Sequence, residues 1–151
     1  MDNLPPRIHQ WLLDRGISED VISRAGLRWE ESILVIPIFD KNGVVLFNKY
    51  RRDPEDNKKP KYWYDKGGTT SLYGIHELGD AQEVIICEGE LDRLLLVSKG
   101  YVAVSSTGGA GSFEKSWVDL LEGRKVFTCY DNDAAGQNGV ERINKVVTEL
   151  W

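Results

Sequence analysis

The sequence is poor in the residues that build zinc sites and disulfide frameworks. Its 151 residues include only two cysteines and two histidines (Cys87, Cys129, His9 and His76), and none of them stands at a metal-ligand spacing. Both cysteines lie inside apolar runs, so we expect small buried side chains rather than a disulfide. The zinc-binding class of proteins is therefore not indicated.

A long apolar run is also missing. No stretch approaches the roughly 20 residues of a membrane-spanning helix, and the first residues, MDNLPPR, lack the basic-then-apolar pattern of a signal peptide. We therefore expect a cytoplasmic protein without a membrane partner. A hydrophobic fraction of 41% and a charged fraction of 28% are ordinary for one medium core or two small ones.

An overall excess of positive charge is absent too, since the formal net charge is −5. The segment from Lys49 to Lys66, here called the basic stripe, nevertheless holds seven basic and four acidic residues, a local charge of +3. A basic stripe on an acidic body suits phosphate binding at one place. Strand alternation predicts Lys49 and Arg51 on one face and Arg52 on the other.

The first half of the chain predicts short helices followed by antiparallel strands. Helices are expected over residues 5–15 and 18–26, because proline or serine stands at each start and glycine follows each end. From Ile33 the apolar period becomes that of strands, with a Lys-Asn-Gly turn at 41–43. We therefore expect a helical segment, 1–28, and a β-rich subdomain, 29–80.

From residue 81 to 151, strand and helix patterns alternate. Apolar runs at 83–87, 101–106 and 125–130 are each followed by a helical pattern, which is typical of parallel βαβ units with right-handed crossovers. The chain is thus predicted to be an α/β protein whose parallel-sheet domain follows a small helical and antiparallel part.

Acidic residues follow two of the predicted parallel strands. Glu88 comes directly after one apolar run, and Asp131 and Asp133 follow another. Ligands gather at the carboxyl ends of strands in open α/β sheets. Clustered carboxylates repel one another unless a cation neutralises them, and hard oxygen ligands suit Mg²⁺ or Mn²⁺. Asp92 either joins this cluster or stabilises the start of its own helix.

These motifs resemble those of a known family. EGELD at 88–92 and YDNDAAGQ at 130–137, with PKYW at 60–63 and SLYGIHEL at 71–78 upstream, are similar to the Toprim region of DnaG-type and phage-type DNA primases. The resemblance implies a Toprim domain at 81–151 that lacks its last strand. It also implies that Asp131 and Asp133 hold Mg²⁺, while Glu88 either joins them or serves as general base.

The implied activity is metal-dependent synthesis of short RNA primers. The implied partners are a single-stranded DNA template, NTPs and a replicative helicase. Lys49, Arg51, Arg52 and Lys61 are the expected ligands of template or triphosphate, and Lys61 is favoured because it matches the lysine of the family's P-K-Y stretch. Two alternatives remain open: a Toprim nuclease that cleaves phosphodiesters, and a non-catalytic nucleic-acid-binding fragment.

A glycine-rich loop, TGGAGS at 107–112, follows the second predicted parallel strand. It completes neither a Walker A loop nor a dinucleotide fingerprint, because Glu114 stands where each motif needs glycine. Gly108 and Gly109 are expected either to let a nucleotide or template approach the backbone or to form a tight connecting turn.

Overall fold

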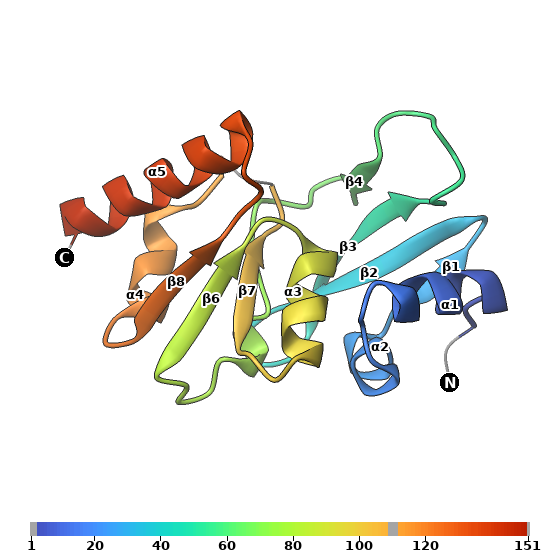
Figure 1. Cartoon of the computed structure of the whole chain (residues 1–151), viewed down its shortest axis with the longest axis horizontal. Coiled ribbons are helices and arrows are strands. Elements are labelled where there is room, and N and C mark those ends of the chain that lie inside the picture. The colour runs from blue at the N-terminus through green and yellow to red at the C-terminus, as the bar shows by residue number, and fades with distance from the viewer. Residues whose placement is uncertain (1–2, 109–111, 151) are drawn as a thin grey trace. The chain divides into compact units, whose positions relative to one another are not determined.

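The computed structural model describes residues 3–108 and 112–150 and divides the chain into two compact units, which meet between Gly68 and Thr69 (Figure 1). This division differs from the boundary expected at residue 80. Strand β5 (Leu72–Tyr73) pairs antiparallel with β7 (Ala103–Ser106), so the residues just after 68 belong to the second sheet. The helical segment 1–28 shares its unit with the first sheet rather than standing apart.

The two predicted N-terminal helices are present. Helix α1 spans Pro6–Asp14 and α2 spans Glu19–Ala25. The Ser18 hydroxyl accepts a hydrogen bond from the backbone N of Val21, which satisfies one of the free donors at the start of α2. Gly26 ends α2 with a φ of 68°, a conformation that glycine adopts without steric cost.

The first sheet is antiparallel, with the order β1-β2-β3-β4. Its strands are Arg28–Glu30, Ile33–Phe39, Val45–Arg52 and Tyr62–Tyr64. Apolar side chains of the two helices and of β2 are buried, among them Ile8, Leu12, Ile22, Leu34 and Ile36. Each such side chain contributes about 1.5–3 kcal/mol of transfer free energy, so their burial accounts for the stability of this small unit.

Asp65 holds β3 against the segment that follows β4. Its carboxylate accepts hydrogen bonds from the Tyr50 hydroxyl and from the backbone N of Asn48, the latter at 2.8 Å. The Tyr50 ring stacks on Trp63 across the two strands, with centroids 5.7 Å apart. The hydrogen bond from Tyr50, followed by that from Asn48, lowers the pKa of Asp65 below its ordinary value.

The lowered pKa of Asp65 predicts a loss of stability in acid. The ionised carboxylate stabilises the fold above the pKa it has in the unfolded chain, and this contribution is lost as pH falls through the lower folded pKa. The urea midpoint should therefore fall more between pH 7 and about pH 3 in the wild type than in Asp65→Asn. Glu55→Gln, at an exposed carboxylate of the same unit, is the control and should keep the wild-type slope. Equal slopes for Asp65→Asn and wild type would contradict the prediction.

The second sheet has the order β5-β7-β6-β8, and its pairs β6–β7 and β6–β8 are parallel. Strand β6 spans Glu83–Cys87 and β8 spans Lys125–Cys129. The α/β class, the antiparallel first part and the parallel second part are confirmed. Strand β8 ends two residues before Asp131, so strand alternation does not orient Asp131 and Asp133 as predicted.

Helices of the second unit are α3 (Glu90–Ser98), α4 (Val118–Leu121) and α5 (Ala134–Leu150), with short 3₁₀ turns at Ile75–Glu77 and Lys115–Trp117. Helix α3 packs on β7 and β6, whereas α4 contacts α5 (Figure 1). One core joins the sheet to α4, with Val84, Ile86, Val104, Phe113 and Leu121 among its buried members. In the described part of the chain, no helix combines the length and apolarity needed to cross a membrane.

Candidate acidic site at the carboxyl edge of the second sheet

Strands β6 and β8 bring Glu88 and Asp131 together. The two strands are paired in parallel through their last residues, Cys87 and Cys129, so the chain leaves both strands at the same edge of the sheet. The backbone N of Asp131 donates a hydrogen bond to Glu88 Oε2 over 3.1 Å. The structure therefore places the Glu88 carboxylate beside the Asp131 backbone at this edge.

The pKa of Glu88 is raised by its surroundings. Burial is the largest cause that raises the pKa of Glu88 above its ordinary value, and the hydrogen bond from the Asp131 backbone opposes it. The side chain of Asp131 and the charges of Asp131 and Asp133 raise this pKa further. Negative charge at this edge is thus not compensated by the described side chains, and a bound cation would relieve the repulsion.

Asp133 lies at the start of α5. Its Oδ1 accepts a hydrogen bond of 2.7 Å from the backbone N of Gly136, and its carbonyl accepts one of 2.9 Å from the backbone N of Gln137. This is the position where a carboxylate satisfies a free backbone donor and favours the helix dipole. The Asp133 side chain therefore helps to fix the first turn of α5.

Within residues 3–108 and 112–150, no three acidic, histidine or cysteine side chains are arranged to hold a metal ion. A hydrogen bond links Glu88 to the backbone of Asp131, and the three-carboxylate cluster stays a prediction. The candidate ligands Glu88, Asp131 and Asp133 would fit a hard divalent cation, because each offers carboxylate oxygens. Asp92 lies in the first turn of α3, consistent with either expected role.

The two cysteines behave differently. Cys87 is buried, as predicted, and burial followed by the charge of Asp92 raises its pKa. Cys129 is exposed, which corrects the prediction of a buried side chain. The reason lies in tertiary structure: β8 is the edge strand of its sheet, and most of its residues are exposed.

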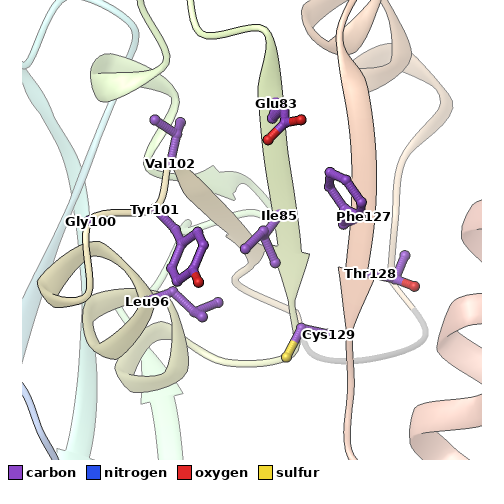
Figure 2. A pocket seen from close by; sticks show the side chains of 9 residues that line it. All are labelled: Glu83, Ile85, Leu96, Gly100, Tyr101, Val102, Phe127, Thr128 and Cys129. Atoms are coloured by element: carbon purple, nitrogen blue, oxygen red, sulfur yellow. The ribbon is translucent and has the colours of Figure 1, made fainter.

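A groove of about 530 Å³ opens beside this edge, between the end of α3 and strands β6 and β8 (Figure 2). Its walls include Ile85, Leu96, Tyr101 and Phe127, and Cys129 stands at one end. None of the candidate carboxylates lines the groove. This hollow in the surface of the second unit is therefore a neighbour of the acidic edge rather than part of it.

The basic stripe lies in the first unit, on β3, β4 and the connection between them. Lys49 and Arg51 are both buried, and Arg52 is half-buried, so the predicted separation of the two faces is confirmed. The Arg51 guanidinium lies 4.7 Å from the ring centre of Trp11 and 5.7 Å from that of Tyr62. Lys49 Nζ lies 5.1 Å from the same Tyr62 ring. These two cations are therefore held by aromatic rings rather than projecting into solvent.

Arg52 and Lys61 have different surroundings. Arg52 donates to the carbonyl oxygens of Pro60 and Lys59 and lies 4.9 Å from the Trp63 ring centre, which orders the loop between β3 and β4. Lys61 is exposed. Lys61 is the most exposed of the four basic candidates, and its Nζ lies 6.0 Å from the Tyr62 ring centre.

The glycine-rich loop is tightly folded where it is described. The backbone N of Gly108 donates to the Ser106 hydroxyl, which itself bonds to the Ser112 hydroxyl. A Cβ on Gly108 would lie 2.8 Å from the Ser112 oxygen, so the loop needs glycine there for its own packing. This supports the connecting-turn alternative. Gly109 lies outside the described residues.

Sequence analysis missed Arg93, which is only 2% exposed. Its Nε donates to the Ala103 carbonyl at 2.9 Å, its Nη2 pairs with Glu77 at 2.8 Å, and its guanidinium lies 4.8 Å from the Tyr73 ring centre. Its position in the helix could have indicated its burial, because residue 93 falls on the same helical face as Glu90 and Leu94, both of which are buried.

Known proteins are similar to this chain in sequence or in fold. The family model described as Toprim-like matches residues 85–150. The DNA primase of Neisseria meningitidis serogroup A is 27% identical over 143 residues, covering 87% of this chain and 23% of that protein. The primase fragment of the bacteriophage T7 primase-helicase protein superposes with a TM-score of 0.75 at 22% identity, over 89% of this chain and 59% of that chain.

A DnaG primase catalytic domain bound to single-stranded DNA gives a TM-score of 0.74 at 22% identity, over 95% of this chain and 60% of that chain. The Toprim-like match covers less than half of the chain and includes the acidic edge at Glu88, Asp131 and Asp133. The whole chain shares its fold with primase catalytic domains. It spans less than a quarter of the length of the curated relative.

Proposed function

We propose that this chain is part of a primase that makes short RNA primers on a single-stranded DNA template by metal-dependent nucleotidyl transfer. The observation that carries the proposal is the pairing of Glu88 with Asp131 at the carboxyl edge of a primase-type Toprim sheet. Its proposed partners are DNA, NTPs and a replicative helicase, as in the T7 primase-helicase protein. The cytoplasm is the compartment proposed for it.

Glu88, Asp131 and Asp133 would hold Mg²⁺ or Mn²⁺, with Asp92 as a further ligand. Such an ion, when bound, neutralises charge on a triphosphate and on the attacking 3′-oxygen. The residues themselves set the geometry: the Asp131 backbone orients the Glu88 carboxylate, and the Gly136 backbone orients that of Asp133. Glu88, whose pKa is raised, is also the proposed acceptor of the 3′-hydroxyl proton.

Lys61 and Arg52 are the first proposed phosphate ligands of the basic stripe. Lys49 and Arg51, which are buried, are the second. The support for the first pair is the exposure of Lys61 and the ordering of the Lys59–Pro60 carbonyls by Arg52. Approach of a nucleotide or the template at Gly108 and Gly109 stays the second proposal for this loop, after the connecting turn that the Gly108 contacts support.

The test offers the protein circular single-stranded DNA, labelled ATP and the other NTPs, with Mg²⁺ or Mn²⁺, and resolves the products on a denaturing gel. We expect short labelled oligomers, reduced about 100-fold or more in Asp131→Asn, because removing one charged metal ligand costs several kcal/mol of transition-state stabilisation. Asp119→Asn, at an exposed acid on α4, is the matched control and should keep full activity.

The other outcomes would point elsewhere. If the protein cleaves DNA without making oligomers, and Asp131→Asn does not cleave it, the acidic edge belongs to a Toprim nuclease. A control for both activities is circular dichroism, which should show the same fold for Asp131→Asn as for wild type. Neither product, with DNA binding retained, would indicate a nucleic-acid-binding module, a reading favoured by the incomplete three-carboxylate arrangement among the described residues.

A further inference from the structure

The two cysteines end neighbouring strands at the same register position. Cys87 is the last residue of β6, Cys129 is the last residue of β8, and the two are paired directly across the parallel strands. Directly paired residues project their side chains to the same face of a sheet. Neighbouring strands lie about 4.7–4.9 Å apart, within the Cα separation of about 4.4–6.8 Å that a disulfide requires.

One thiol of this pair is accessible and the other is covered. Cys129 is exposed, and Figure 2 shows its side chain leaning from β8 toward the end of β6. Cys87 is fully buried, and its thiol donates to the carbonyl oxygens of Val104 and Gly89 over 3.5 and 3.8 Å. A small oxidant therefore reaches Cys129 directly, whereas Cys87 is reached only from its partner.

We propose that Cys87 and Cys129 are a modification site that closes to a reversible disulfide when the thiol pool is oxidised. The oxidant is a small-molecule disulfide such as oxidised glutathione. The Cys129 thiolate attacks one glutathione sulfur, forming a mixed disulfide and releasing one glutathione. The Cys87 sulfur then attacks the Cys129 sulfur and releases the second. Two protein thiols are oxidised, one glutathione disulfide is reduced, and the two thiol protons pass to the released glutathione.

The geometry makes this disulfide reversible rather than structural. Cβ atoms of a disulfide lie about 3.5–4.5 Å apart, closer than the spacing of the strands, so the ends of β6 and β8 must draw together. Strained disulfides are the more easily reduced ones. Glu88 directly follows Cys87, and Asp131 is two residues after Cys129. Closure therefore shifts the two carboxylates of the acidic edge, a consequence that rests on the proposed function.

The modification is tested by mass spectrometry of the native chain after incubation with oxidised glutathione. We expect loss of both free thiols, a monomer lighter by two hydrogen atoms, a peptide that links the two strands, and recovery of both thiols with dithiothreitol. Cys87→Ala should stop at a stable mixed disulfide on Cys129, and Cys129→Ser should leave Cys87 unmodified. A stable mixed disulfide on wild-type Cys129, unreacted thiols or a disulfide-linked dimer would overturn the proposal.

The consequence for the acidic edge is measured separately with Mn²⁺ alone. We expect the oxidised protein to bind Mn²⁺ about tenfold more weakly than the reduced protein, as when the support of a metal ligand is disturbed. The affinity of Cys129→Ser should not change on treatment. If the disulfide forms and the affinity stays the same, the coupling is wrong. If the reduced protein binds no Mn²⁺, the proposed function is wrong. The mass spectra would still show whether the disulfide between Cys87 and Cys129 forms.

Discussion

Replacing Gly136 with alanine is expected to disrupt the acidic edge although it improves the helix propensity of α5. A Cβ at residue 136 would lie 2.0 Å from the carbonyl oxygen of Asp131, 2.9 Å from its carbonyl carbon and 3.1 Å from its nitrogen. All three atoms are backbone, so no side-chain rotation relieves the clash. Either Asp131 or the first turn of α5 must move, and with it the hydrogen bonds to Glu88 and Asp133.

The sign of the effect separates two physical causes. Propensity alone predicts that alanine in place of glycine stabilises a helix by about 1 kcal/mol. The close approach predicts the opposite, together with a loss of metal-dependent activity about as large as that of Asp131→Asn. Asn138→Ala changes an exposed residue of the same helix and should show the propensity effect alone.

Thermal unfolding, Mn²⁺ binding and primer synthesis are the measurements for Gly136→Ala. A variant that is more stable than wild type and equally active would show that the approach of Gly136 to Asp131 is not required. A variant that unfolds can still be judged by its midpoint, because propensity and close approach predict shifts of opposite sign.

Arg93→Ala is expected to destabilise the second unit by about 2–4 kcal/mol, because it leaves a buried carbonyl without its donor and a cavity in place of the buried side chain. The substitution removes a guanidinium that is 2% exposed and leaves the Ala103 carbonyl without its donor. It also takes the cation from the face of Tyr73, whose pKa burial raises to about 12. A loss of this size is a large share of the stability of a small domain.

Two further variants identify which interaction matters. Glu77→Gln keeps the acceptor near Arg93 but removes its charge, and because Glu77 is partly exposed its loss should be smaller. Arg93→Lys should not restore stability, because an ammonium lacks the forked donors that reach Ala103 and Glu77 together. Urea unfolding measures all three variants. A loss below about 1 kcal/mol for Arg93→Ala would place the network among ordinary surface contacts.

The sequence predicts well those helices and strands whose ends or apolar pattern are set by neighbouring residues. Both N-terminal helices could be predicted because Ser18 caps α2 and Gly26 ends it. The parallel strands could be predicted because they are short, apolar and separated by helical patterns. Strand β5 could not, because its two residues acquire strand geometry only by pairing with β7.

The candidate site shows the same limit. The residue types at 88, 131 and 133 predict a cation site, because neighbouring carboxylates repel one another unless a cation neutralises them. The orientation of Asp133 depends instead on where β8 ends and on a bond from Gly136. The contact of Arg51 with Trp11 likewise joins residues that are distant in sequence.

The class of fold, the order of its elements and the acidic and basic residues of the proposed chemistry all follow from the sequence, because periodicity, capping and charge are properties of neighbouring residues. The boundary at Gly68, the exposure of Cys129 beside a buried Cys87, and the enclosure of Arg93 follow from tertiary packing alone. Each of these three depends on which strands and helices pack together, and that free energy comes from contacts between segments distant along the chain.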